Sequence, residues 1–125
     1  MIRRERVEDF NEVYDVVKAA FAAAECSDGK EQDLVVALRN SDAYVPELSL
    51  VAEVDGKIVG YIMFTEAEVG NRTELVLAPL AVLPEHQRQG IGTALIVEGH
   101  RIARELGYSY SVVLGSEKYY PRFGY

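Results

Sequence analysis

The chain has 125 residues, of which 49% are hydrophobic and 26% charged, which fits one soluble domain with a hydrophobic core and is too short for two. The absence of low-complexity segments and of internal repeats excludes a disordered or repeat protein. Twenty acidic residues against thirteen basic ones give a net charge of −7, which argues against a nucleic acid partner held through its phosphates.

The first part of the chain predicts a short strand followed by two helices. Residues 1–6 lack the apolar core of a signal peptide, and no apolar run approaches a membrane span, so we expect a cytoplasmic protein that does not enter a membrane. A short strand is expected near Ile2. Apolar residues at three-and-four spacing from Phe10 to Ala24 predict an amphipathic helix, with Glu8 and Asp9 at its positive end. A second, shorter helix is expected from about Lys30 to Arg39.

Three long β-rich runs follow. Leu48 to Val54 and Ile58 to Thr65 flank Asp55-Gly56, a strong hairpin signal because both turn residues tolerate positive φ. These two runs therefore predict an antiparallel pair. The third run, Glu74 to Val82, contains Pro79, which cannot donate to a ladder, so a bulge or an edge is expected there.

The last part of the chain predicts a helix and a strand. The helical pattern from Gly90 to Leu106 ends before Gly107, where a left-handed C-terminal cap belongs. A strand is expected from Tyr110 to Leu114. The element order is βααβββαβ in one domain, residues 1–125, and predicts an α/β (α+β) fold with a mixed sheet and helices on both faces. Cys26 is a lone thiol, so we expect no disulfide and no metal site.

The polar loop before the last helix indicates an anion-binding site. It carries two glycines one residue apart, Gly90 and Gly92, which allow a backbone to approach a bulky anion closely. The first-turn amides of a helix carry about half a positive charge, and Arg88 adds a bidentate donor. No third glycine and no Gly-Lys-Ser/Thr follow, which excludes a dinucleotide fingerprint and a nucleotide phosphate loop. A helix start with incidental glycines remains the alternative.

The loop also resembles a known cofactor motif. Gln87-Arg88-Gln89-Gly90-Ile91-Gly92 matches the Gln/Arg-x-x-Gly-x-Gly/Ala motif of the GNAT superfamily of N-acetyltransferases. Leu80 to Glu85 is similar to that family's strand and turn before the motif, and Tyr119 to Tyr125 resembles its later Phe/Tyr-Tyr-x-x-x-Gly-Phe/Tyr segment. The ending is most similar to that of a small bacterial subfamily with Tyr-Tyr-Pro-Arg-Phe-Gly-Phe/Tyr. The resemblance implies a GNAT-like, mostly antiparallel sheet that splays at the cofactor site. It also implies acetyl-CoA as co-substrate, without a metal.

The same resemblance implies roles for individual residues. The main chain of the fourth strand would pair with the pantetheine arm, and the loop would cradle the pyrophosphate. Tyr120 would be the catalytic general acid that protonates the leaving thiolate, although Tyr119 could exchange roles with it or Tyr120 could be a packed aromatic. The implied cofactor-binding residues are Leu80, Ala81, Val82, Gln87, Arg88, Gln89, Gly90, Ile91, Gly92 and Thr93.

The general base stays open. The family's frequent glutamate in the fourth strand has no counterpart between Ala78 and Ala81. Glu66, Glu68 and Glu74 could act directly or through water, or each could be a solvated strand residue. The only two histidines, His86 and His100, are expected to face solvent.

Three functions are compatible with these patterns. The first is an N-acetyltransferase in which a small-molecule or protein amine attacks acetyl-CoA directly in a ternary complex. The second is a catalytically silent acyl-CoA-binding module of the same fold, and the third is an α/β domain without a cofactor. Family members usually continue for two strands beyond the segment that ends here at Tyr125. We therefore expect an uncovered sheet edge, which favours truncation, an exchange of segments or a homodimer.

Overall fold

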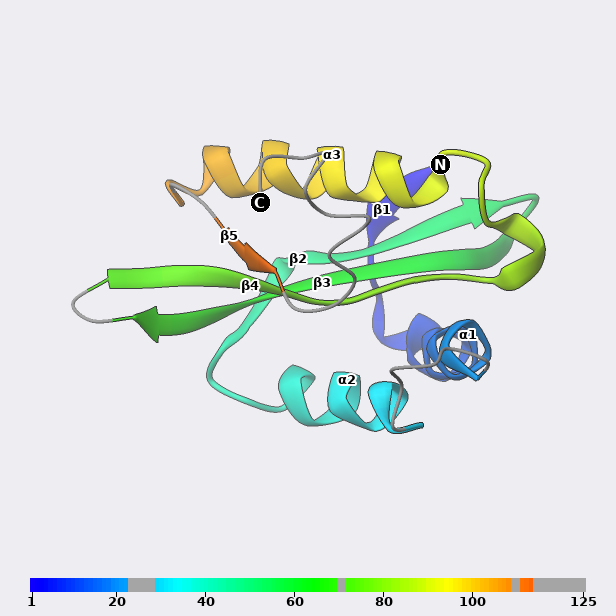
Figure 1. Cartoon of the computed structure of the whole chain (residues 1–125), viewed down its shortest axis with the longest axis horizontal. Coiled ribbons are helices and arrows are strands. Elements are labelled where there is room, and N and C mark those ends of the chain that lie inside the picture. Colours follow the sequence, from blue (N-terminus) through cyan, green and yellow to red (C-terminus); the bar gives the residue numbers. More distant parts are fainter. Residues whose placement is uncertain (23–28, 70–71, 109–110, 114–125) are drawn as a thin grey trace.

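A five-stranded sheet forms the middle layer of the molecule, with two helices on one face and one on the other (Figure 1). The structure, a computed structural model, describes residues 1–22, 29–69, 72–108 and 111–113. The strands follow the order β1-β2-β3-β4-β5; the first four are antiparallel neighbours, and β5 runs parallel to β4. The mixed, mostly antiparallel sheet flanked by helices is therefore confirmed. In chain order the elements are β1 (Ile2–Arg4), η1 (Val7–Asp9), α1 (Phe10–Phe21), α2 (Glu31–Arg39), β2 (Tyr44–Val54), β3 (Lys57–Val69), β4 (Arg72–Val82), η2 (Pro84–His86), α3 (Ile91–Glu105) and β5 (Ser111–Val113).

Element types agree with the sequence prediction, whereas several ends do not. The Asp55-Gly56 turn has φ of 53° and 79°, as a tight hairpin requires. Strand β3 continues past Thr65 to Val69, because its ladder with β4 runs on to the pair Val69↔Arg72. The two short 3₁₀ helices were not predicted, since segments of three residues carry too little periodic signal.

Two apolar layers hold the helices against the sheet. Alternation along β3 sends Ile62 and Phe64 toward α3, and Tyr61 and Met63 toward α1 and α2. All four side chains are fully buried. The sheet is therefore apolar on both faces, and each helical layer is tied to it by a separate core.

Two glycines let α3 lie close to β3. A Cβ atom on Gly60 would lie 3.1 Å from Cγ2 of Ile91 and 3.2 Å from Cδ1 of Leu95. A Cβ atom on Gly99 would overlap the buried ring of Phe64. These contacts set the depth of α3 on the sheet, and with it the position of the loop that precedes the helix.

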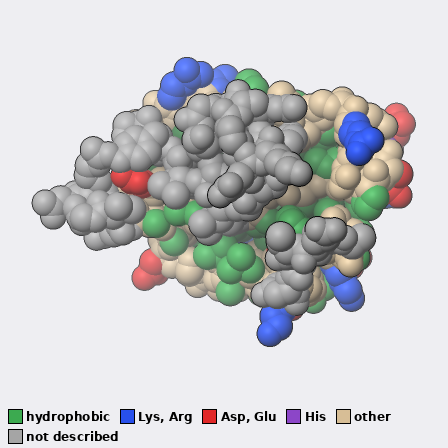
Figure 2. All heavy atoms as spheres, viewed as in Figure 1, with side chains coloured by type: hydrophobic (Ala, Val, Ile, Leu, Met, Phe, Trp, Pro, Cys, Tyr) green, Lys and Arg blue, Asp and Glu red, His purple; other side chains and the backbone are tan. Residues whose placement is uncertain are grey.

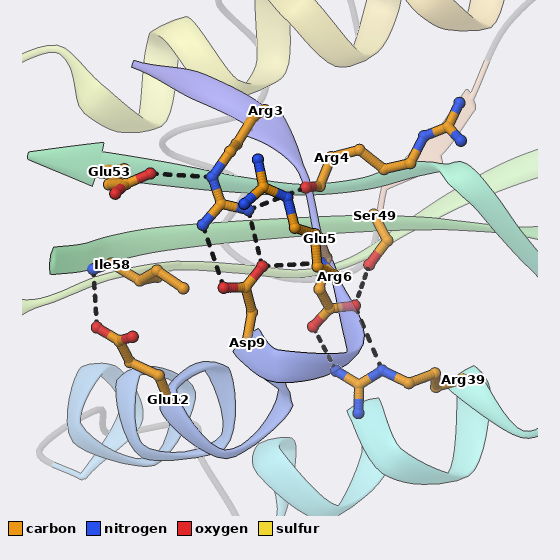
Figure 3. A network of polar contacts seen from close by, with 10 residues as sticks. All are labelled: Arg3, Arg4, Glu5, Arg6, Asp9, Glu12, Arg39, Ser49, Glu53 and Ile58. Carbon is orange, nitrogen blue, oxygen red and sulfur yellow. Dashed lines mark hydrogen bonds and ion pairs between the residues drawn. The ribbon is translucent and has the colours of Figure 1, made fainter. Parts of the chain in front are cut away.

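A buried ion pair fastens α2 to the sheet (Figure 3). The guanidinium of Arg39 donates to both carboxylate oxygens of Glu5, at 2.6 Å and 3.3 Å, and the side chain of Glu5 has no exposed surface. The Ser49 hydroxyl donates to the same carboxylate at 2.8 Å. Burial alone would lower the pKa of Arg39, but the Glu5 carboxylate raises it above its usual value. The pair is therefore charged and internally satisfied.

A second, more exposed network joins β1 to η1 and β2. Arg3 donates to both carboxylate oxygens of Asp9, at 2.7 Å and 3.1 Å, and to Glu53 at 2.9 Å (Figure 3). These hydrogen bonds hold the pKa of the Asp9 carboxyl below its usual value. On the face seen in Figure 2, acidic and basic side chains lie around the rim, and hydrophobic side chains gather nearer the centre. Among the described side chains in this view, the acidic ones thus form no single patch.

Candidate functional site

Strand β4 contains a bulge beside its pairing with β5. Ile62 lies opposite Leu80 and Phe64 opposite Leu77, so β4 has one more residue than β3 in this interval. The predicted irregularity at Pro79 is confirmed. Among the described residues, β5 pairs with β4 only before the bulge, from Leu75 to Leu77.

Beyond the bulge, successive residues of β4 point their backbone N–H and C=O groups alternately toward β3 and away from it. The Leu83 amide donates to the Val59 carbonyl at 2.8 Å. In an antiparallel ladder this bond turns the N–H and C=O groups of Ala81 and Leu83 toward β3. The N–H and C=O groups of Leu80 and Val82 therefore point away from β3, along the edge on the side of β5. We call the main chain of Leu80 to Val82 the β4 edge.

The loop between η2 and α3 has an unusual backbone. Arg88 has φ of 65° and Gly90 has φ of 83°, whereas Gln89 between them does not have positive φ. Alternation of this kind can turn successive N–H groups into one concavity that suits an anion. A left-handed conformation costs a non-glycine residue about 1–2 kcal/mol, so this conformation of Arg88 is unusual.

The first turn of α3 directly follows this loop. Gly90 is the N-cap, and its carbonyl accepts the first helical hydrogen bond, from the Ala94 amide at 3.0 Å. The amides of Ile91 and Gly92 precede that bond in the helix and belong to its positive end. No acidic side chain lies in this first turn, and a Cβ atom on Gly90 would meet nothing within 4 Å. This end of α3 is thus open, positive and able to hold an anion.

Side-chain amides tie the loop to its surroundings. Nε2 of Gln87 donates to the Val82 carbonyl at 3.0 Å, and Nε2 of Gln89 donates to the Glu85 carbonyl at 3.4 Å. Gln87, Arg88 and Gln89 are otherwise exposed, and Thr93 is half-buried in the first turn of α3. The sequence motif placed Gln87 at the cofactor but carried no sign of its bond to the strand.

The three candidate glutamates belong to the part of the β3–β4 ladder next to the hairpin turn, away from the loop. Glu66 accepts a hydrogen bond from the Tyr108 hydroxyl at 2.8 Å. Burial, and then this carboxylate, raise the pKa of Tyr108 to about 12, so the phenol stays protonated and donates. Glu74 is buried and not solvated, and the main chain of Glu68 lies opposite that of Thr73 in the β3–β4 ladder.

The catalytic tyrosine predicted from the sequence, Tyr120, and its alternative, Tyr119, lie outside the described residues. The expectation for the histidines needs correction. His100 is half-buried, with its ring centroid 6.2 Å from that of Phe64, because α3 lies close to β3 there. Burial, and then Arg104, lower the pKa of His100. His86 is also half-buried, at the end of η2.

No cavity, metal site or membrane-spanning helix among the described residues coincides with the predicted site. An open hollow of about 380 Å³ between β1 and the second half of α3 contains none of the predicted site residues. Within the described ranges, no group of three or more His, Cys, Asp or Glu side chains could hold a metal ion. No helix in that part of the chain is long and apolar enough to span a membrane.

Comparisons with known proteins agree on one family. The model of the Acetyltransferase (GNAT) family matches residues 10–125. The protein named uncharacterized N-acetyltransferase YjhQ of Escherichia coli K12 is 40% identical over 121 residues, which cover 94% of this chain and 64% of YjhQ. YhbS of the same strain is 40% identical over 81 residues, 62% of this chain and 48% of YhbS. The chain thus spans about half to two thirds of these curated relatives.

Two crystal structures are similar over nearly the whole chain. A GNAT family acetyltransferase from Brucella melitensis, in complex with acetyl-CoA, superposes with a TM-score of 0.91 and 41% identity, covering 99% of this chain and 80% of that one. YhbS from Escherichia coli, in complex with CoA, gives a TM-score of 0.87 and 31% identity, covering 99% of this chain and 67% of that one.

Proposed function

The chain belongs to the GNAT acetyltransferase family, and on this premise we propose that it binds acetyl-CoA and transfers the acetyl group to an amine. The observation that carries the proposal is the junction of the bulged strand β4 with the loop before α3. There, an edge of main-chain groups and an open, positive helix end lie within one short stretch of chain. The complexes of the Brucella protein with acetyl-CoA and of YhbS with CoA support the choice of ligand.

We assign the pyrophosphate of acetyl-CoA to the loop. The amides from Gln89 to Gly92, and Thr93 in the same turn, lie at the positive end of α3, and Arg88 can add a charged donor. The open space beside Gly90 allows the close approach that a diphosphate needs.

The pantetheine arm is assigned to the β4 edge. Its two amides need hydrogen-bond partners, and the outward N–H and C=O groups of Leu80 and Val82 offer them in the manner of an added strand. The N–H and C=O groups of Ala81 point toward β3, and its side chain is buried on the α1 side of the sheet. Ala81 therefore offers no hydrogen bond to the ligand and only holds Leu80 and Val82 in place.

The reaction in this proposal is a direct attack. The amine nitrogen attacks the thioester carbonyl carbon, a C–N bond forms, and the C–S bond breaks. The leaving thiolate takes the proton of the Tyr120 hydroxyl, and the nitrogen loses a proton to a base or to water. A phenol suits this task because its reference pKa, about 10, lies near that of a departing thiol.

The acceptor is an amine of unassigned identity. Glu74 is buried on β4, Glu66 accepts the Tyr108 hydroxyl, and both lie on the hairpin side of the bulge, so neither is assigned as the base.

A thermal-shift titration with acetyl-CoA, followed by a panel of amines, tests the proposal. Saturation at about 100 times Kd should stabilise the fold by about 2.7 kcal/mol. Release of free thiol is then measured with each amine against the constant background of the single thiol, Cys26. No rise in melting temperature would rule out the cofactor, whereas a rise without thiol release for any amine would leave a binding module.

A further inference from the structure

Gln87 makes a contact that the acetyl-CoA motif does not account for. Its side chain is exposed, yet Nε2 donates to the carbonyl of Val82 at 3.0 Å, across the five-residue step from the strand to the loop. Only the nitrogen of a carboxamide can donate, so the acceptor fixes the orientation of the group. The side chain is therefore directed back toward β4.

The accepting carbonyl belongs to the β4 edge. The bond from Leu83 to Val59 turns the Val82 carbonyl away from β3, to the same side as the outward groups of Leu80. Because Gln87 donates to one lone pair of this carbonyl, the carbonyl can accept only one further hydrogen bond, and the Val82 N–H and both groups of Leu80 make up the rest of the edge. Gln87 thus marks the end of the edge.

The same bond also fixes the start of the loop. Gln87 lies between η2 and the two positive-φ residues Arg88 and Gly90. Its backbone N–H donates to the Pro84 carbonyl at 3.4 Å, and its side-chain amide reaches back to the Val82 carbonyl on β4. The position of the loop relative to the strand therefore depends on this one side chain as well as on the backbone.

We propose that Gln87 is a positioning residue that holds the pyrophosphate loop in register with the β4 edge, so that one CoA molecule engages both. This inference rests on the proposed function. It differs from a direct contact of Gln87 with phosphate in what it predicts for the two halves of CoA. A positioning residue matters when one ligand must reach both parts of the site, and it matters little for either half alone.

The test compares wild type with Gln87→Met, which keeps the length of the side chain and removes the donor. Calorimetry or NMR titration gives Kd for CoA, for 3′-phosphoadenosine 5′-diphosphate and for pantetheine. We expect Kd for CoA to rise about fivefold, equivalent to about 1 kcal/mol, as for one exposed hydrogen bond. Each half should bind within about twofold of its wild-type affinity.

A matched control removes a similar bond elsewhere. Nδ2 of Asn40 donates to the Val36 carbonyl at 2.8 Å at the exposed end of α2, so Asn40→Leu loses an amide–carbonyl bond remote from the loop. Both variants should lower the melting temperature by a similar amount, but Asn40→Leu should keep the wild-type Kd for CoA. Where an acceptor is known, Gln87→Met should raise KM for acetyl-CoA and leave kcat unchanged.

Each other outcome has a definite meaning. An unchanged Kd for CoA in Gln87→Met, with wild type binding normally, overturns the positioning role alone. A loss of nucleotide affinity as large as the loss for CoA shows a direct phosphate contact and overturns it as well. Failure of the wild-type protein to bind CoA would overturn this inference together with the proposed function.

Discussion

Gly90 and Gly107 flank α3 and form a natural pair for testing the loop. Their φ values are 83° and 93°, and a Cβ atom on either would meet nothing within 4 Å. Alanine at either position therefore adds no clash and only the cost of a left-handed residue, about 1–2 kcal/mol. Alanine also has less conformational freedom than glycine in the unfolded chain, and this offsets about 0.4–1 kcal/mol of that cost. Both variants should thus lose about 1 kcal/mol, or about 3–6 °C in melting temperature at this chain length.

Binding of acetyl-CoA should separate the two variants. The methyl group of Gly90→Ala enters the open space at the start of α3, where the proposed diphosphate approaches, whereas Gly107 lies beyond the other end of the helix. Gly90→Ala should weaken binding at least tenfold, about 1.4 kcal/mol, and Gly90→Val by more. Gly107→Ala should bind as wild type does. Calorimetric titration of each variant measures Kd directly.

Two results would refute this reasoning. Equal losses of affinity in the two alanine variants would show that the stability of α3, not close approach at the loop, controls binding. An unchanged Kd in both Gly90→Ala and Gly90→Val, with the expected fall in melting temperature, would show that the diphosphate does not lie beside Gly90.

Three further predictions concern catalysis and packing. Tyr120→Phe should lower turnover about 10²–10⁴-fold in a thiol-release assay and leave Kd for acetyl-CoA unchanged; full turnover would make Tyr120 a packed aromatic. Gly99→Ala should lower the melting temperature, because overlap with Phe64 costs about 1–3 kcal/mol and exceeds the gain in helix propensity of up to about 1 kcal/mol; a higher melting temperature would contradict the tight contact. Arg39→Met should lower the free energy of unfolding in urea by about 3–5 kcal/mol, because it leaves the Glu5 carboxylate buried and unpaired. Adding Glu5→Gln should recover part of that loss, whereas a loss under about 1 kcal/mol in Arg39→Met would contradict the buried ion pair.

The sequence alone determined the features that depend on neighbouring residues. The Asp55-Gly56 turn, the bulge at Pro79 and the left-handed Gly107 after α3 each follow from the φ range or missing donor of one or two residues. The loop motif likewise indicated an anion site at a helix start, since glycine spacing and the helix dipole are local properties.

Only the tertiary structure decided the features that depend on pairing between distant segments. The outward direction of the Leu80 and Val82 main chain follows from the register with β3, and a slip of one residue would reverse it. The burial of Glu74 and of His100 depends on which face of a strand or helix meets its neighbour. The bond from Gln87 to Val82 requires a bulged strand and a turn to meet in space, so no local pattern in the sequence specifies it.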